Sequence, residues 1–190
     1  MAYYRSVGLI GLARAGKDSV AARLRQRYGY QRVAFADPVR AAALRTDPLI
    51  PTSYGVHTRL STLVNAAGWD YAKTTYPEVR RVLQNIGQTV RDMDPDFWVR
   101  AAFPAIEAAK TLNLPVVVSD VRYENEARAL LLDGFTLIRV TRPGTGLAGD
   151  AGRHKSETEL DAWATDLTIG NTGSLDDLNS TVDSLTLPRN

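Results

Sequence analysis

Short apolar runs alternate with amphipathic segments along this chain. Five apolar runs predict buried strands, at residues 7–10, 32–35, 115–119, 135–140 and 166–169. Apolar residues at helical spacing predict helices over 17–28, 78–93 and 124–132, a weaker one over 58–67, and one over 96–112 that Pro104 interrupts and kinks. Strands that alternate with helices predict an α/β fold, with a mostly parallel five-stranded sheet and helices on both faces.

Turn and cap signals place the remaining boundaries. Asp37 caps a predicted helix whose first position is a proline, and capping patterns at 156–159 and 174–177 predict two further short helices. The segment 46–55 is rich in Pro, Thr and Ser and predicts an exposed loop. The segment 142–155 is rich in Gly and Arg and predicts a mobile loop.

Composition narrows the class of protein. A chain of 190 residues, of which 44% are hydrophobic, suits one domain with a full core. It has no cysteine, which excludes disulfides and zinc–thiolate sites, and no stretch long and apolar enough to cross a membrane. Because its start lacks the pattern of a signal peptide, we expect a soluble cytoplasmic protein, in the host cytoplasm if it is viral. The net charge of +2 does not favour a nucleic-acid polymer as partner.

The stretch GLARAGKDS, Gly11 to Ser19, follows the first predicted strand and opens the first predicted helix. Its spacing of Gly, four residues, Gly and Lys is that of a phosphate-binding P-loop. The glycines let backbone N–H groups surround an anion at the positive end of the helix, where Lys17 would reach the β- and γ-phosphates of a nucleotide. The alternative is a glycine turn with an exposed lysine, which the flanking strand and helix disfavour.

Asp18 stands where a P-loop usually has the Ser or Thr that holds magnesium. A carboxylate beside a triphosphate needs a cation between them, and magnesium would serve, held by Asp18 directly or through water, or by Ser19. Alternatively, Asp18 only complements the helix dipole. The residues alone leave both interpretations open.

Another acidic residue ends the third predicted strand, in the stretch VVVSDVR. Parallel strands end at one edge of their sheet, so Asp120 would point toward the P-loop and hold the water shell of magnesium or accept a proton. Arg122 would bind a substrate phosphate. An acidic residue after an apolar run is common, and only the pairing with the P-loop favours a site here.

The predicted helix over 78–93 carries Arg80, Gln84, Gly87 and Arg91 in one stripe beside its apolar face. A glycine inside a helix costs about 1 kcal/mol relative to alanine, which makes sense where a ligand must approach the backbone. The stripe could therefore hold a phosphate and a base edge. From the residues alone, a solvated helix face is the favoured interpretation.

Two segments near the C-terminus carry further candidate groups. The loop at 142–155 contains Arg142 and Arg153, and arginines on a closing loop would stabilise the charge that spreads during phosphoryl transfer. An ordinary surface loop is the alternative. The last predicted strand leads to Asn171 in an Asn-Thr-Gly turn, which could pack against a nucleotide base. The two histidines lie far apart in the sequence and indicate no metal site.

Taken together, these segments resemble the deoxynucleoside monophosphate kinases of tailed bacteriophages, within the P-loop nucleoside monophosphate kinase superfamily. The resemblance rests on stretches that occur in the family's order: GLARAGKDS, AFADPVR, RRVLQNIGQTVRDMDPDFWV, VVVSDVRYENEA, RHKSE and DLTIGNTGSLDDL. It spans Gly11 to Leu178, and LQNIGQ, DFWV and DVRYENEA are its most discriminating parts. The family's P-loop reads Gly-Lys-Asp, so Asp18 is compatible with a working site.

The resemblance implies an enzyme that transfers the γ-phosphate of ATP to a deoxynucleoside monophosphate (dNMP), with magnesium, to give ADP and a deoxynucleoside diphosphate. It implies a three-layer P-loop kinase fold in a single domain. The expected parts are a core at about 1–45 and 113–190, a helical dNMP-binding region at about 46–112, and a lid at about 142–156. The segment 40–77 matches the family least and would shape the choice of base.

By motif, the resemblance also implies which residues form the site. ATP is bound by Gly11, Arg14, Ala15, Gly16, Lys17, Asp18, Ser19 and Asn171, the last at the adenine. The dNMP is bound by Arg14, Asp37, Arg40, Arg80, Gln84, Arg91, Trp98, Arg122 and Glu126. The catalytic residues are Lys17, Asp120, Arg122, Arg142 and Arg153. Magnesium is held, directly or through water, by Asp18, Ser19 and Asp120. Trp98 either walls the acceptor pocket or packs in the core, and Glu124, like Glu126, contacts the acceptor sugar or the arginines.

Other functions stay open as alternatives. A dephospho-coenzyme A kinase has a similar last turn, although the helix stripe and DVRYENEA argue against it. A nucleotide-binding regulatory NTPase would hydrolyse slowly without an acceptor, but the chain lacks the Asn-Lys-x-Asp base motif of GTPases. A DNA-binding accessory protein is disfavoured by the near-neutral charge. We expect small-molecule nucleotides as partners, neither a nucleic-acid polymer nor a membrane, and leave a homodimer as an open alternative.

Overall fold

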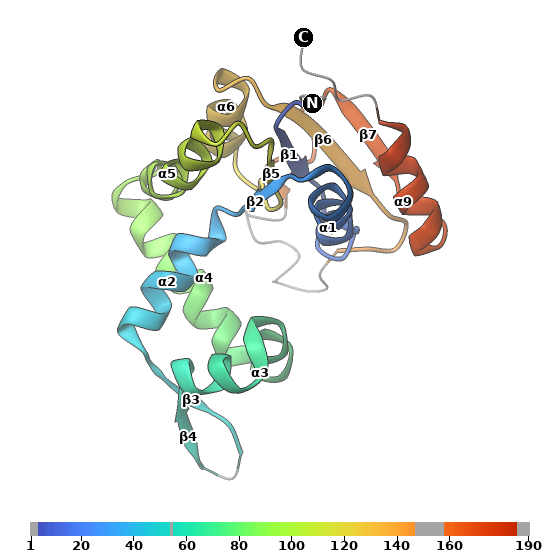
Figure 1. Ribbon diagram of the computed structural model, residues 1–190. Helices are drawn as coiled ribbons and strands as arrows, with labels where there is room; N and C mark the ends of the chain where they lie inside the picture. Colours follow the sequence, from blue (N-terminus) through green and yellow to red (C-terminus); the bar gives the residue numbers. More distant parts are fainter. Residues whose placement is uncertain (1–3, 54, 147–157, 186–190) are drawn as a thin grey trace. The chain divides into compact units, whose positions relative to one another are not determined.

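The computed structural model describes residues 4–53, 55–146 and 158–185. The chain forms two compact units, which we describe separately. The first unit combines Met1–Phe35 with Ala102–Asn190, and the second unit is Ala36–Ala101. Their elements are labelled in Figure 1.

A five-stranded sheet forms the centre of the first unit, in the order β2-β5-β1-β6-β7. Its strands are β1 (Val7–Ile10), β2 (Gln31–Val33), β5 (Val116–Val118), β6 (Thr136–Thr141) and β7 (Leu167–Gly170). All four neighbouring pairs are parallel. Each strand falls on one of the five predicted apolar runs, so the predicted α/β fold with a parallel five-stranded sheet is confirmed.

Helices cover both faces of this sheet. They are α1 (Lys17–Tyr28), α6 (Glu124–Leu132) and α9 (Leu175–Ser184), together with the second half of α5 (Phe97–Thr111). The connections β1-α1-β2 and β5-α6-β6 run in opposite directions along the sheet, and right-handed crossovers then put α1 and α6 on opposite faces. Figure 1 shows α9 beside α1.

The side chains of β1 alternate between the two helical layers. Val7 and Leu9 belong to the buried cluster that contains residues of α1 and α9. Gly8 faces the other layer, where an added Cβ would lie only 2.9 Å from Leu130 of α6. A glycine at this position therefore lets α6 pack closely against the sheet.

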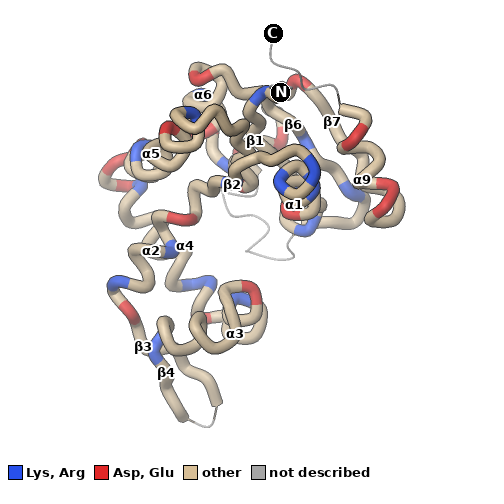
Figure 2. The backbone as a smooth tube through the Cα atoms, viewed as in Figure 1, with Lys and Arg blue, Asp and Glu red and all other residues tan. Residues whose placement is uncertain are grey.

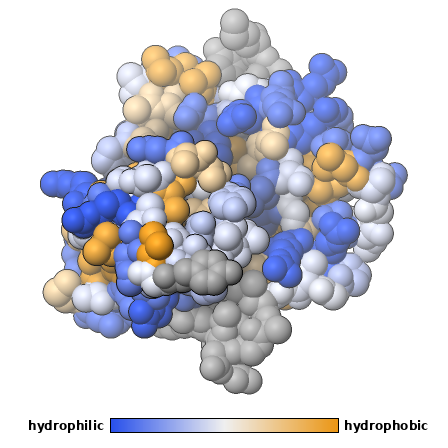
Figure 3. Space-filling model, turned by 90° about the horizontal axis from the view of Figure 1, so that it is seen from below, coloured by the Kyte–Doolittle hydropathy of each residue, from blue (hydrophilic) through white to orange (hydrophobic). Residues whose placement is uncertain are grey.

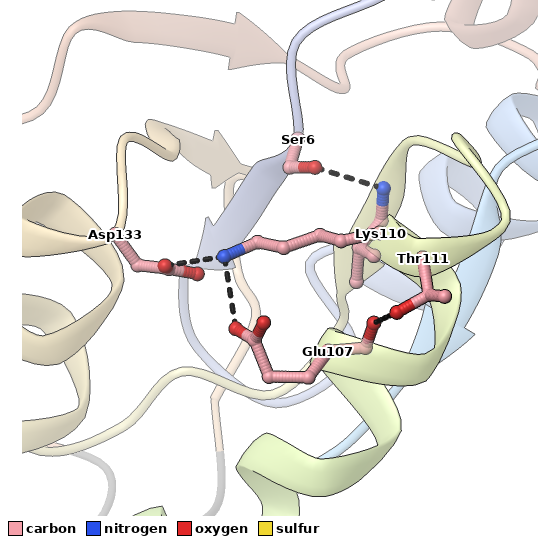
Figure 4. Close-up of polar contacts among 6 residues, drawn as sticks. Ser6, Glu107, Lys110, Thr111 and Asp133 are labelled. Carbon is pink, nitrogen blue, oxygen red and sulfur yellow. Dashed lines mark hydrogen bonds and ion pairs between the residues drawn. The ribbon is translucent and has the colours of Figure 1, made fainter.

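A partly exposed ion cluster joins α5 to the end of α6. Lys110 Nζ donates to Glu107 at 3.1 Å and also to Asp133 (Figure 4). Burial lowers the pKa of Lys110, but these two carboxylates outweigh it and raise the pKa above its ordinary value. Beside the cluster, Ser6 Oγ accepts a hydrogen bond from the backbone N–H of Val116 at 3.0 Å, which joins the starts of β1 and β5.

The second unit is mainly helical. It contains α2 (Ala36–Thr46), α3 (Leu60–Thr75), α4 (Pro77–Met93) and the start of α5, with the antiparallel strands β3 (Leu49–Pro51) and β4 (His57–Arg59). Its own buried cluster is formed by Ala43, Ile50, Leu60, Ala72 and Val79.

Two predictions for the second unit are wrong in part. The segment 46–55 is not only an exposed loop, because Leu49–Pro51 pairs with His57–Arg59 and buries Ile50. Three-residue strands are too short to show an alternating pattern. The weak helix expected over 58–67 extends to Thr75 as α3, through Gly68 at φ +79°. The helix predicted over 78–93 is confirmed as α4. α5 runs through Pro104 as one helix, so the interruption predicted there is wrong.

The surface carries mixed charge and scattered hydrophobic side chains. Basic and acidic residues are interspersed along the chain (Figure 2). The face displayed in Figure 3 shows hydrophobic side chains in small separate groups among hydrophilic ones. Among the described residues, none of the helices has both the length and the hydropathy needed to span a membrane.

Candidate functional site

The loop between β1 and α1 has the backbone that the glycine spacing predicted. Gly11 and Gly16 have φ of +147° and +110°. Residues with a side chain rarely adopt this backbone conformation, whereas glycine does so readily. A Cβ on Gly11 would also lie 2.3 Å from the carbonyl oxygen of Val140, and a Cβ on Gly16 would lie 2.6 Å from Asn171 Nδ2. Both glycines are therefore required, by conformation and by close packing. The loop turns inward and α1 begins directly after it, so backbone N–H groups and the helix dipole favour an anion here.

Lys17 is the first residue of α1 and is buried. Its Nζ donates to the carbonyl oxygens of Gly11 and, at 2.9 Å, of Leu12. The ammonium group therefore lies inside the loop, next to the position where a bound phosphate would contact the loop amides. Arg14, the other cationic residue of the loop, adopts a left-handed conformation with φ of +67°.

A pocket of about 430 Å³ opens beside this loop. It is lined by Arg14, Gly16, Lys17, Asp18, Ser19, Arg142, Asn171, Gly173, Ser174, Leu175 and Leu178. Seven of these lining residues are predicted site residues, drawn from the P-loop, the lid and the last turn. Ala15 is buried and its carbonyl oxygen accepts a hydrogen bond from Asn171.

The pocket also contains residues that the sequence interpretation did not assign to the site. Gly173, Ser174, Leu175 and Leu178 follow Asn171 in the turn and the first part of α9. Ser174 caps α9, and its hydrogen bonds with Asp177 lower the pKa of that carboxyl. The capping pattern at 174–177 was visible in the sequence, and it marks where this wall of the pocket begins.

Asp18 and Ser19 give the pocket one carboxylate and one hydroxyl next to Lys17. In the part of the chain that the structure describes, no three or more His, Cys, Asp or Glu side chains gather as a metal site. Magnesium does not need such a cage, because it is usually held by one or two carboxylates together with substrate phosphates and water. The residues present therefore fit a magnesium ion that arrives with a nucleotide.

Asn171 connects the last turn to the P-loop. Its Nδ2 donates to the carbonyl oxygen of Ala15 at 2.9 Å, and its backbone N–H donates to Thr141 at 2.7 Å. The side chain is buried, with 4% of its surface exposed. Asn171 lies in the wall of the pocket. That it belongs to an ATP site and contacts adenine stays a prediction.

Arg142 follows β6 and enters the same pocket. Thr145 Oγ1 donates to the carbonyl oxygen of Arg142 at 2.6 Å, and the N–H of Gly146 donates to Ala13 of the P-loop at 3.0 Å. The first residues of the predicted lid are thus attached to the P-loop. The rest of the lid, including Arg153, lies outside the described residues.

The segment after β5 forms a turn in which the carboxylate of Asp120 is hydrogen-bonded to the end of the β2 segment. Asp120 Oδ1 accepts the N–H of Phe35 at 2.8 Å. Ser119, immediately before it, buries its hydroxyl without a hydrogen-bond partner among the described residues, as expected where a ligand or water completes the contact. Neither residue lines the 430 Å³ pocket.

Glu126 and Glu124 occupy different surroundings at the start of α6. Glu126 Oε2 accepts the backbone N–H groups of Arg122 at 2.9 Å and Tyr123 at 3.2 Å. Glu124 pairs with Arg128 at 2.9 Å in a surface ion pair. The structure therefore shows Glu126 as a support of the turn that carries Arg122.

The remaining predicted acceptor residues belong to the second unit: Asp37, Arg40, Arg80, Gln84, Arg91 and Trp98. Asp37 and Arg40 form an ion pair at 2.9 Å within α2. Arg80 donates to the carbonyl oxygen of Lys73 at 2.9 Å.

Trp98 is buried and belongs to the packing of the second unit. Its indole N–H donates to the carbonyl oxygen of Gly87 at 2.9 Å. Its ring meets Phe97 edge to face, with ring centroids 4.9 Å apart. Of the two interpretations offered for Trp98, the structure supports a packed position; a wall of a ligand site stays a prediction.

Residues 57–182 match the family "Deoxynucleotide monophosphate kinase". That match covers most of the chain, including the stretch from α3 to α9.

Viral proteins are among the relatives in sequence. "Putative deoxynucleotide monophosphate kinase" of Acanthamoeba polyphaga mimivirus is 28% identical over 170 residues, which is 81% of each chain. "Uncharacterized protein ORF77" of Ictalurid herpesvirus 1 is 35% identical over 88 residues, 46% of this chain. The alignments span only 39% and 43% of two relatives from that herpesvirus, ORF77 and ORF76.

Solved structures support the fold. A dephospho-CoA kinase from Campylobacter jejuni superposes with a TM-score of 0.51, at 12% sequence identity, over 96% of this chain and 95% of its own. At this identity the likeness concerns the fold alone, which is that of P-loop kinases.

Proposed function

The chain belongs to the deoxynucleotide monophosphate kinase family, and we propose that it transfers the γ-phosphoryl group of ATP to a deoxynucleoside monophosphate. The observation that carries the proposal is the P-loop between β1 and α1, with Lys17 inside it and a pocket of about 430 Å³ beside it. The match to the mimivirus protein supports the choice of a dNMP as acceptor.

In this proposal, the donor site is the described pocket. The loop from Gly11 to Ser19 surrounds the phosphates of ATP with backbone N–H groups, and Lys17 leaves the loop carbonyls to contact the β- and γ-phosphates. Asp18, Ser19 and Asp120 would hold magnesium, directly or through water, and the ion would supply positive charge to the phosphates. The base lies toward the wall made by Asn171 and the residues that follow it.

Phosphoryl transfer requires little covalent chemistry from the protein. The two substrates must lie in line, and the negative charge on the moving group must be neutralised. We assign that role to Lys17, Arg142 and Arg153, with Arg14 facing the same group. Closure of the lid at about 142–156 would exclude water, which otherwise competes as acceptor.

We assign acceptor-binding residues to the helical region at about 46–112 and, separately, to the turn after β5. Arg122 contacts the acceptor phosphate, and Asp120 helps to hold the metal or accepts a proton. The remaining acceptor contacts are assigned to Asp37, Arg40, Arg80, Gln84, Arg91, Trp98, Glu124 and Glu126. Nucleotides are thus the proposed partners.

The test is release of ADP from ATP and magnesium, with acceptors added one at a time. The acceptors are dAMP, dGMP, dCMP, dTMP, their ribose counterparts and dephospho-coenzyme A. Release that requires a deoxynucleotide supports the proposal and defines its base preference. Release with dephospho-coenzyme A alone assigns the other activity, and slow release that ignores every acceptor indicates a regulatory NTPase.

A pair of variants links this activity to the P-loop. Lys17→Ala should abolish transfer and leave the fold intact, because it removes a cation that we place on the phosphates. Arg27→Ala is the matched control, since Arg27 is an exposed cation in the last turn of the same helix. Normal turnover by Lys17→Ala would contradict the site assignment.

A further inference from the structure

Asn171 joins two segments of the donor site that are distant in the sequence. Its side-chain Nδ2 donates to Ala15, 156 positions away in the P-loop, at 2.9 Å. Its backbone N–H donates at 2.7 Å to Thr141, the residue before the pocket-lining Arg142. One residue therefore contacts both the phosphate loop and the base of the lid.

The direction of the carboxamide follows from its partner. A carbonyl oxygen can only accept, so the amide nitrogen, not the amide oxygen, must point at Ala15. One of the two N–H donors of this amide is consequently used inside the protein. The packing is also tight, because a Cβ on Gly16 would lie 2.6 Å from the same nitrogen.

These contacts bear on the shape of the phosphate site. Ala15 and Gly16 immediately precede α1, and their backbone conformation determines where the loop N–H groups point. Glycine adopts the positive φ of +110° at Gly16 without strain but has no side chain that fixes it, so contacts from neighbouring groups decide how rigid this position is. The buried amide of Asn171 is a neighbouring group that can hold Gly16 in this conformation.

We propose that Asn171 is a positioning residue, which holds the P-loop and the base of the lid in place for the phosphates of the donor, whatever its base. The proposal rests on the proposed kinase function for its effect on turnover, but not for its effect on phosphate binding. This positioning role differs from the expected contact with adenine. A residue that only contacts the base would not change the binding of a phosphate compound that has no base.

The deciding probe is inorganic tripolyphosphate, which has the phosphates of ATP and no base. Isothermal titration calorimetry of the full chain with magnesium would measure its affinity and that of ATP. Asn171→Leu removes the donor without adding charge, and Thr172→Ala is the matched control on the exposed next residue. For Asn171→Leu we expect both affinities to fall by a similar factor, about tenfold, as for loss of one buried hydrogen bond. Thr172→Ala should leave both unchanged.

Kinetics supply an independent readout. The ratio of ATP to GTP turnover should be the same in Asn171→Leu as in the wild type, because positioning does not distinguish bases. A loss confined to ATP, with tripolyphosphate affinity retained, would overturn the proposal and make Asn171 a base-reading residue. Unchanged affinity for both ligands would overturn it as well.

The design separates failure of this inference from failure of the proposed function. Parallel loss of both affinities in a chain that phosphorylates no dNMP would uphold the positioning role and refute the kinase assignment. A wild-type chain that binds neither ligand would overturn both. Titrations are made well below the unfolding temperature of each variant, and Asn171→Ala, which adds no bulk, replaces Asn171→Leu should the latter not fold.

Discussion

Replacing Glu126 tests whether a buried carboxylate supports the turn that presents Arg122. Only 2% of Glu126 is exposed, which is unusual for a charged residue. Its Oε2 accepts the N–H groups of Arg122 at 2.9 Å and Tyr123 at 3.2 Å, just before α6 begins. Glu126→Ala would remove this acceptor from both donors in a half-buried turn.

The size of the effect follows from these two contacts. A hydrogen bond to a charged group contributes about 1.5–3 kcal/mol, and loss of a helix cap typically costs about 1 kcal/mol. Because the two bonds share one oxygen, we expect the free energy of unfolding to fall by about 3 kcal/mol rather than by the full sum. For a chain of this size that lowers Tm by roughly 6–12 °C. Glu126→Gln keeps the shape and an acceptor oxygen, so its cost should be about 1 kcal/mol.

Urea denaturation followed by circular dichroism would measure these differences. Glu124→Ala is the matched control, because its carboxylate forms only a surface ion pair with Arg128 on the same helix and should change stability by about 0.5 kcal/mol or less. In the folded Glu126→Ala protein, the KM for the acceptor should rise as the Arg122 turn loosens. An unchanged free energy of unfolding together with a raised acceptor KM would refute this reasoning and make Glu126 a direct ligand of the acceptor.

Three further predictions concern the P-loop, the helix α4 and the loss of stability at acid pH. Gly11→Ala places a Cβ 2.3 Å from a carbonyl oxygen at a φ of +147°, so it should abolish nucleotide binding in calorimetry, whereas Gly170→Ala, which meets nothing within 4 Å, should not. Gly87→Ala meets only an ordinary contact at 3.8 Å and should raise thermal stability by up to about 1 kcal/mol; a simultaneous rise in acceptor KM would indicate a ligand that approaches this backbone. The hydrogen bond from Arg23 lowers the pKa of Asp183 in the folded protein below its usual 3.8. The ionised carboxylate therefore stabilises the folded state fully above pH 3.8, and this contribution is lost as the pH falls through the lower pKa of the folded state. The stability difference between wild type and Asp183→Asn should therefore vanish at acid pH in urea titrations, and a difference independent of pH would contradict this origin.

The strands of the central sheet could be predicted because each overlaps a short apolar run, and the two central strands β1 and β5 are buried along their whole length. Their parallel direction followed from the helices between them, as in other α/β folds. Their spatial order did not follow, because β5 lies between β1 and β2 although it comes much later in the chain. The position of β5 between two earlier strands depends on packing between residues far apart in the sequence, and no local sequence pattern indicates it.

The hairpin of the second unit could not be predicted from its local sequence. Leu49–Pro51 and His57–Arg59 pair over three residues each, and a proline ends the first. Strands this short, one of which ends in a proline, give little local signal, and burial of Ile50 in the cluster with Leu60 and Val79 stabilises the pairing. Tertiary packing therefore decides this element, and the composition of the segment favoured a loop.

The donor site illustrates why some functional residues are visible in a sequence and others are not. The P-loop is built from consecutive residues whose glycines are needed for local reasons, so its spacing alone predicts its shape. The contact between Asn171 and Ala15 joins residues 156 positions apart, and an Asn-Thr-Gly turn has the same appearance with or without it. Likewise, a glutamate at the start of a helix is compatible with a solvent-exposed cap or a substrate ligand, and only the burial of Glu126 favours a supporting role. A sequence motif therefore does not reveal which residues act by holding the backbone of other site residues. In this chain those residues are Asn171 and Glu126, and substituting them discriminates best between a ligand contact and a structural support.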